Sequence, residues 1–293
     1  MTRHALALAL LMGCSSVAAQ ERTPQLALPA APAAAVQQGR TSVHATLLGI
    51  GRVRQLDTYL SPLQYRGPQL QLMHETLRRT RWAHGNVTFQ TLWHGDLAYT
   101  GNDPDNVHTL GADINYDAAL HYHLIGAAPP LPAGPRATPP APRFRLLAGP
   151  QIGTTLGVLY NTRNGNNPAQ ALASLRLSAS VAAVCDFRLR RQPLSARYQL
   201  DLPLVGLMFS PAYGQSYYEI FSLGHTDHNI RLTHPLNAFT SRHLLSVDIP
   251  LRPFTLRAAY LCDIRQSHVN DIRHHSYTHA FMLGWVRRLV ILK

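Results

Sequence analysis

The sequence predicts an all-β protein: a transmembrane antiparallel up-and-down β-barrel of about ten strands, within a range of about 8–12. Three observations predict this class. Long segments alternate between apolar and polar residues, the N-terminus has the pattern of an export signal, and no later segment has the roughly 18 consecutive apolar residues of a spanning helix. Hydrophobic residues make up 46% of the chain, and a barrel accommodates such a content by alternation.

The clearest alternating segment runs from Leu110 to Leu124. One phase is apolar and contains two tyrosines, whereas the other carries carboxylates and imidazoles, so a strand here has one apolar and one polar face. Strands of soluble proteins usually have about 5–6 residues, but a tilted strand crosses a bilayer with about 9–11. We therefore interpret this segment as a barrel strand whose apolar face contacts lipid.

The N-terminal residues 1–19 have the features of a secretory signal peptide, since basic residues precede an apolar run and Val17-Ala18-Ala19 supplies small residues for cleavage. Residues 20–42 are rich in Ala, Pro and Gln and are expected to form a flexible leader, which leaves 43–293 for the barrel. The run from Leu11 to Cys14 also resembles a lipobox, so lipidation of Cys14 is an open alternative, although Met12 fits it poorly.

The strands before residue 125 follow from the same pattern. The segment 43–54 alternates least regularly because Gly49 and Gly51 interrupt its phase, 69–79 sets leucines against glutamines, and 87–99 is nearly as regular as 110–124. Residues 55–66 are expected to form a loop that ends at Gly67-Pro68, residues 82–85 a tight turn, and residues 101–106 a loop of turn-forming residues.

The second half of the chain predicts six further strands, at about 144–160, 173–189, 194–204, 242–251, 256–265 and 276–291. The proline-rich residues 127–142 cannot enter a sheet, and we expect them to be a periplasmic turn insert. Residues 161–169, 208–239 and 266–275 read as loops, and 190–193 and 250–253 as turns. An even number of strands places both termini in the periplasm, so residues 208–239 become a long extracellular loop.

The composition and charge limit the classes of partner that this protein can have. The formal net charge is +12, and arginines supply nearly all of the positive charge because Lys293 is the sole lysine. These arginines are dispersed and the chain is exported, so we expect no nucleic-acid partner. The expected location is the outer membrane of a Gram-negative cell, and the expected partners are outer-membrane lipid and the barrel assembly machinery. We expect a monomer without a cofactor.

Charged residues in the polar phases would point into the barrel. A barrel of this size is just filled by side chains, and buried charges must be paired. We therefore predict an interior charge network, with a structural role favoured over an ion path, formed by Glu75, Asp113, Asp117, Arg176, Asp186, Arg188, Arg197, Asp201, Arg257, Asp263 and Arg265.

Candidate catalytic groups lie on strands expected to meet near the outer rim. His94, Asp96, Asp113 and His279 could converge there, by analogy with the acidic and histidine groups at the rim of ten-stranded omptin proteases. Ser276 beside His274 gives a second possibility, a lipid esterase. Pairing of the rim groups with arginines in a closed cleft would argue against an enzyme.

The histidines also raise the question of a metal. His225 and His228 lie in the longest loop, and His274 and His275 lie near the last one, so these imidazoles could converge on an ion. Because their spacing matches no metal motif, we predict scattered, solvent-exposed histidines and no metal site.

The run from Asp57 to Leu63, with Tyr65 and Gly67, follows an exported leader and a Gly-Ile-Gly strand. It resembles a family of outer-membrane proteins of the Bacteroidetes described as domain of unknown function 3316. The resemblance implies a barrel from about residue 43 to the end and supplies no catalytic residues. One departure is the C-terminus, which lacks the terminal aromatic residue common in barrels.

These observations predict a barrel with a charged, side-chain-filled interior in a structural or surface-binding role, with residues 208–239 and 266–275 as its contact surface. The alternative is a rim-sited outer-membrane hydrolase, either an omptin-like protease or a lipid esterase. A soluble periplasmic β-sandwich would need polar outward faces, which the apolar, tyrosine-flanked phases do not provide.

Overall fold

The computed structural model describes residues 40–126, 143–165, 167–251 and 254–291, and Thr41–Val290 form one compact unit. The predicted signal peptide, Cys14, most of the leader and the proline-rich insert at 127–142 lie outside the described residues. No helix in these ranges has the length and apolar character needed to cross a membrane.

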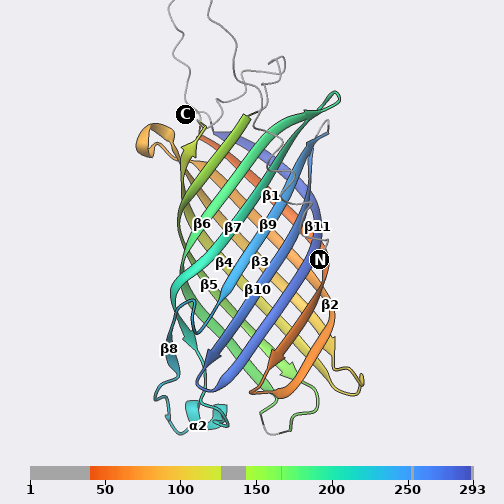
Figure 1. Cartoon of the computed structure of the whole chain (residues 1–293), viewed down its shortest axis with the longest axis vertical. Coiled ribbons are helices and arrows are strands. Elements are labelled where there is room, and N and C mark those ends of the chain that lie inside the picture. Colours follow the sequence, from red (N-terminus) through yellow and green to blue (C-terminus); the bar gives the residue numbers. More distant parts are fainter. Residues whose placement is uncertain (1–39, 127–142, 166, 252–253, 292–293) are drawn as a thin grey trace, which may run out of the picture. The chain divides into compact units, whose positions relative to one another are not determined.

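Within the described residues, ten long antiparallel strands close into a barrel, and an eleventh, short strand is attached to its wall (Figure 1). The ring runs from β1 to β7 in chain order, continues through β9, β10 and β11, and returns to β1, while β8 pairs with the end of β7. This confirms the predicted up-and-down barrel. The elements are β1 (Arg40–Asp57), β2 (Ser61–Arg79), η1 (Trp82–Gly85), β3 (Val87–Gly101), β4 (His108–Ile125), β5 (Arg143–Asn161), β6 (Ala169–Leu189), β7 (Gln192–Phe209), α2 (Tyr217–Phe221), β8 (Ile230–Thr233), β9 (Thr240–Pro250), β10 (Thr255–Val269) and β11 (Ile272–Ile291).

The two ends of the barrel differ in their connections. One end carries the β1–β2, β3–β4, β5–β6 and β10–β11 connections together with the long segment between β7 and β9, which contains α2 and β8; we call it the loop end (Figure 1, bottom). The other end carries η1 and the short β6–β7 and β9–β10 connections, and we call it the turn end (Figure 1, top).

The outward and inward faces of the strands differ in polarity, as the alternation predicts. On β4, Leu110 and Ile114 are exposed, whereas Asn115, Asp117 and His121 are buried. Large apolar side chains are exposed along the outward phase of the other strands, and most of the buried polar residues belong to the inward phase. The outward leucines therefore form the surface that contacts hydrocarbon in a membrane.

The predicted loop at 55–66 is wrong, because both strands continue through it. β1 extends to Asp57, β2 begins at Ser61, and only Thr58–Leu60 form the turn. The described pairing of β2 with β3 ends at Arg66↔Gly101, whereas Ser61 and Tyr65 pair with Asp57 and Gln55 of β1, on either side of a register shift. A strand with one free edge tolerates Pro62, which cannot donate a ladder hydrogen bond. Proline thus marks an edge here and not a loop.

The predicted loop at 266–275 is also wrong. β10 and β11 continue to Val269 and Ile272, and a two-residue turn joins them. Both turn residues, Asn270 and Asp271, have positive φ angles of 52° and 61°, as the tight hairpin turn that matches strand twist requires. Polar residues there indicate where the hairpin leaves the apolar belt, not where its strands end.

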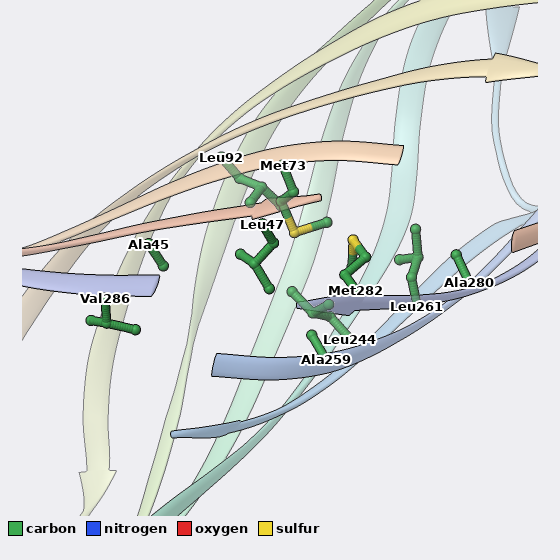
Figure 2. Packing of buried hydrophobic residues seen from close by; sticks show 10 residues of the cluster. All are labelled: Ala45, Leu47, Met73, Leu92, Leu244, Ala259, Leu261, Ala280, Met282 and Val286. Atoms are coloured by element: carbon green, nitrogen blue, oxygen red, sulfur yellow. The ribbon is translucent and has the colours of Figure 1, made fainter. Parts of the chain in front are cut away.

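One part of the inward surface is apolar, which the predicted charge-filled interior did not include. Side chains from β1, β2, β3, β9, β10 and β11 form a cluster inside the wall (Figure 2). Its members are Ala45, Leu47, Met73, Leu92, Leu244, Ala259, Leu261, Ala280, Met282 and Val286. The cluster packs the strands on both sides of the β1–β11 seam, so apolar contacts support the closure of the barrel.

The seam itself predicts a sensitive position at Gly284. A Cβ atom at this residue would lie 1.9 Å from the Thr46 carbonyl oxygen of β1. Gly284→Ala should therefore push β1 and β11 apart and lower the free energy of unfolding by about 1–3 kcal/mol, as overpacking does. Urea titration in phospholipid vesicles measures this change. Gly165→Ala is the matched control, because its Cβ would meet nothing within 4 Å. An equal loss of unfolding free energy in both variants would contradict a specific role for the close contact between Gly284 and β1.

Candidate functional site

The interior of the barrel is a network of charges and amides, and its partners come from strands far apart in the ring. Arg265 on β10 lies close to three carboxylates. Its guanidinium is 2.8 Å from Asp263, 3.0 Å from Asp113 and 3.9 Å from Asp96. Since β4 and β10 are the fourth and ninth strands of a ten-strand ring, the Arg265–Asp113 pair spans the lumen between opposite walls.

Arg242 on β9 forms a second crossing. Its guanidinium lies 2.6 Å from Asp117 on β4 and 2.8 Å from Asp201 on β7. The Asp201 carboxylate also accepts hydrogen bonds from the Ser180 hydroxyl and the Gln199 amide. All of the charged groups are buried, so each charge has the close, hydrogen-bonded partners that burial requires.

A third level is centred on Glu75 of β2. Its carboxylate pairs with Arg257 on β10 and lies 3.7 Å from Arg197 on β7. Arg257 also pairs with Asp248 on β9 at 2.6 Å. Next to this level, the Gln199 amide on β7 donates to Gln90 on β3 at 3.1 Å. Direct bonds therefore join facing walls at successive levels.

Ten of the eleven residues predicted for the network are buried or half-buried on the inward face, and each of these ten forms at least one ion pair. Arg188 departs from the prediction because it is exposed. The ladder of β6 with β5 ends at Asp186, and that of β7 with β9 begins at Ser195. Arg188 thus lies on a hairpin tip that projects beyond the neighbouring strands.

Sequence reasoning missed three inward groups. Arg242 and Asp248 share the inward face of β9, and Arg145 on β5 pairs with Asp186 at 2.7 Å. Arg242 and Asp248 could have been recognised from the alternation of β9, because both fall in the same phase as the polar Ser246. Arg145 lies close to the proline-rich insert, where the pattern gives little indication of the strand's phase.

The four catalytic candidates are not brought together. His94, Asp96 and Asp113 are inside the barrel, where His94 Nε2 contacts Gln71 and the two carboxylates are held by Arg265. His279 is exposed on the outer face and its Nδ1 lies 2.8 Å from the Tyr260 hydroxyl. The alternation of β11 separates His279 from inward residues such as Thr278. The arrangement is a set of paired charges and does not support a rim-sited hydrolase there.

The metal candidates are also dispersed. His225 and His228 are exposed between α2 and β8, whereas His274 points inward and His275 lies on the opposite face of β11. In the described part of the chain, no group of three His, Cys, Asp or Glu residues is arranged to hold a metal ion.

The loop end is covered by a small apolar cluster. Tyr59, Leu60, Leu159 and Ile272 are buried together, with Leu172 and Tyr217 packed against them. The Tyr59 hydroxyl donates to the Gln215 carbonyl at 2.8 Å, and burial together with the adjacent Tyr217 raises the pKa of the Tyr59 phenol above its usual range. These contacts fasten the segment that contains α2 to the barrel.

Helix α2 is fixed at its first turn. The Ser216 hydroxyl accepts from the Glu219 backbone N–H while the Glu219 carboxylate accepts from the Ser216 backbone N–H, which forms a capping box. These hydrogen bonds from Ser216 lower the pKa of the exposed Glu219 carboxyl. The short helix therefore has a defined position despite its length.

Beneath this cover lies a cavity of about 100 Å³, which is open to the surface. It borders inward residues such as Arg176, Arg265, Asp57 and His274. The His274 Nδ1 is 3.0 Å from the Asp57 carboxylate, a pair that the sequence did not indicate because the two residues are 217 positions apart. A smaller cavity of about 20 Å³ adjoins it and is lined by Asp96, Asp113 and Ser276, among others.

The closed ring, its apolar outer face and its polar interior define a β-barrel of the outer-membrane type. The chain belongs to the family of proteins of unknown function DUF3316, whose family model matches residues 5–293. Comparison with curated proteins gives no match.

Several solved outer-membrane barrels are similar in structure. The outer membrane protease OmpT from Escherichia coli has 8% identity and a TM-score of 0.43, over 87% of this chain and 98% of that chain. The translocator domain of the autotransporter NalP from Neisseria meningitidis has 10% identity and a TM-score of 0.36, over 85% and 88%. Neisserial surface protein A has 8% identity and a TM-score of 0.31, over 84% and 99%. Such distant likeness concerns the barrel fold and not activity.

The network predicts that Arg242 is essential for stability. Arg242→Met would leave two buried carboxylates without their shared guanidinium, and we expect the free energy of unfolding to fall by about 3–5 kcal/mol. Urea titration in vesicles measures the change. The control is Arg66→Met, which removes an exposed pair with Asp103 at 2.7 Å and should change stability by about 0–1 kcal/mol. A loss no larger than the control's would contradict the role of Arg242.

Proposed function

We propose that this protein is a non-conducting outer-membrane barrel that acts by binding at its loop end. The observation that carries the proposal is the set of direct side-chain bonds between facing walls, such as Arg265–Asp113 and Arg242–Asp117. Each bond occupies the lumen at its own level, so water and ions have no continuous path. An interior of this kind stiffens the wall and leaves binding to the ends.

The segment between β7 and β9 supports the binding role. It exposes several large apolar side chains: Leu236 is 95% exposed and Phe221 73%, and Tyr213, Tyr218 and Leu223 are more than half exposed. Exposed apolar groups that are grouped in this way are typical of surfaces that contact a partner or a membrane. We propose that the loop end faces the outside of the cell and that this segment is the contact surface.

The closed interior predicts no conductance. The purified chain, inserted in planar phospholipid bilayers, should give no stable single-channel steps, because the lumen is crossed by ion pairs. A wide porin inserted by the same procedure controls for successful reconstitution. Reproducible, voltage-stable steps that appear only with this protein would refute the proposal of a plugged barrel.

The orientation predicts which end reacts in intact cells. In a background with Cys14→Ala, Cys185→Ala and Cys262→Ala, Gly165→Cys places a thiol at the loop end, and Arg191→Cys places one at the turn end, both at exposed positions. A membrane-impermeant maleimide should label only Gly165→Cys in intact cells and both variants after lysis. Labelling of Arg191→Cys alone in intact cells would reverse the orientation.

A further inference from the structure

The wall of the barrel is interrupted between β7 and β9. These strands pair from Ser195↔Asp248 to Asp201↔Arg242, and in the described residues their ladder goes no further toward the loop end. β7 pairs again only from Gly206 onward, with β8. Between the two ladders, the residues Leu202–Val205 have β6 as their partner on one side, and a register shift occurs there.

The sequence explains the interruption. Pro203 has no backbone N–H to donate to a ladder, and the register shift opposite Leu177 and Ser178 turns this part of β7 away from its neighbour. The chain then returns through β8 and crosses to β9 by residues 234–239. An opening framed by β7, β8, this crossing and the start of β9 results, and we call it the window.

The large cavity passes through the window. Its lining includes Leu204 and Val205, which are exposed on the outside, and also Arg176 and Arg265, which belong to the inward network. It further includes Thr233, Ala238 and Thr240, which lie on the other sides of the frame. A single cavity bordered by outward and inward residues connects the outer surface of the wall with the interior.

The window opens in the apolar belt. Val205 is in register with Leu177 on β6, and both side chains are exposed. Exposed leucines surround the opening, namely Leu175 and Leu177 on β6, Leu207 on β7, Leu232 on β8 and Leu245 on β9. In a membrane, the molecule that reaches this opening is a lipid. A soluble ligand entering from the loop end meets the apolar cover formed by Tyr59, Leu60 and Ile272 instead.

The group behind the window indicates which part of the lipid enters. Arg176 is paired in register with Gly206 at the inner edge, and its NH1 donates to the Thr155 and Ser174 hydroxyls. Its carboxylate neighbour Asp117 is 3.6 Å away and is already held by Arg242 at 2.6 Å. Arg176 thus shares its carboxylate partner with Arg242 and has guanidinium N–H groups left for a bidentate ligand. Arg197 also has a distant carboxylate partner, Glu75 at 3.7 Å, but it does not line the cavity.

We propose that the window admits the phosphate-bearing headgroup of a membrane phospholipid, with Arg176 binding the phosphate while the acyl chains remain on the leucines outside. The Ser174 and Ser267 hydroxyls also line the cavity and can donate to the phosphate. This site rests on the proposed membrane placement and gives the binding role a ligand class.

Lipid retention tests the site. The full chain is inserted in nanodiscs of phosphatidylethanolamine that contain equal amounts of phosphatidylglycerol and diacylglycerol, and bound lipid is counted by native mass spectrometry after detergent release. We expect wild type to retain phosphatidylglycerol in preference to diacylglycerol, which has the same chains without phosphate. Arg176→Gln should lower this retention about tenfold, because charge-assisted hydrogen bonds are lost.

The matched control is Arg145→Gln, which removes the same charge from an inward arginine paired with Asp186 outside the cavity. It should retain lipid as wild type does. Ala238→Trp should obstruct the cavity and reduce retention without a change of charge. Heat-modifiable gel migration reports folding and insertion of every variant, so a chain that inserts normally but shows no retention would refute the lipid site and not the membrane placement.

Two results would overturn the proposal. In the first, folded Arg176→Gln retains as much phosphatidylglycerol as wild type, or Arg145→Gln loses as much as Arg176→Gln. In the second, glycerol phosphate binds the wild type and Ala238→Trp equally well, which would show a soluble anion arriving by another route. Loss in Arg176→Gln and Ala238→Trp alone, with no binding of glycerol phosphate, supports lateral entry of a lipid.

Discussion

The structure depends on the pairing of buried charges across the lumen. A narrow barrel turns half of its side chains inward, where charges are stable only with close partners. Arg265, Arg242 and Arg257 each contact carboxylates on distant strands, so the network connects walls that have no ladder between them. The same bonds that satisfy the charges also occupy the lumen, and this makes the interior a structural plug.

Apolar side chains fill the part of the interior that the ion pairs do not occupy. Where β11 meets β1, the described ion pair is His274–Asp57 at the loop end, and the cluster around Leu47, Leu261 and Met282 fills the rest of that side (Figure 2). The interior is therefore divided between a charged side and an apolar side. The interruption of the wall at Pro203 lies away from this seam and borders the charged network.

The alternation predicted the strands and their faces because side-chain direction in a strand depends on local geometry alone. The errors have a common cause. Residues 55–66 and 266–275 were predicted as loops because they are polar or contain proline, but the hairpins continue beyond the apolar belt, where both faces can be polar. Arg188 was predicted inward for the complementary reason: it keeps the inward phase on a tip that extends past its neighbours.

The sequence by itself determined that the chain forms long two-faced strands, that acidic residues and arginines share the inward face, and that Asp117 and Asp201 belong to it. Only the tertiary structure decided that Arg242 joins those two carboxylates, since Arg242 and Asp117 are 125 positions apart. Local periodicity fixes which way a side chain points, whereas strand register and barrel closure fix which groups meet. The window belongs to the second kind, because it results from ladders that end at different heights on β7 and β9.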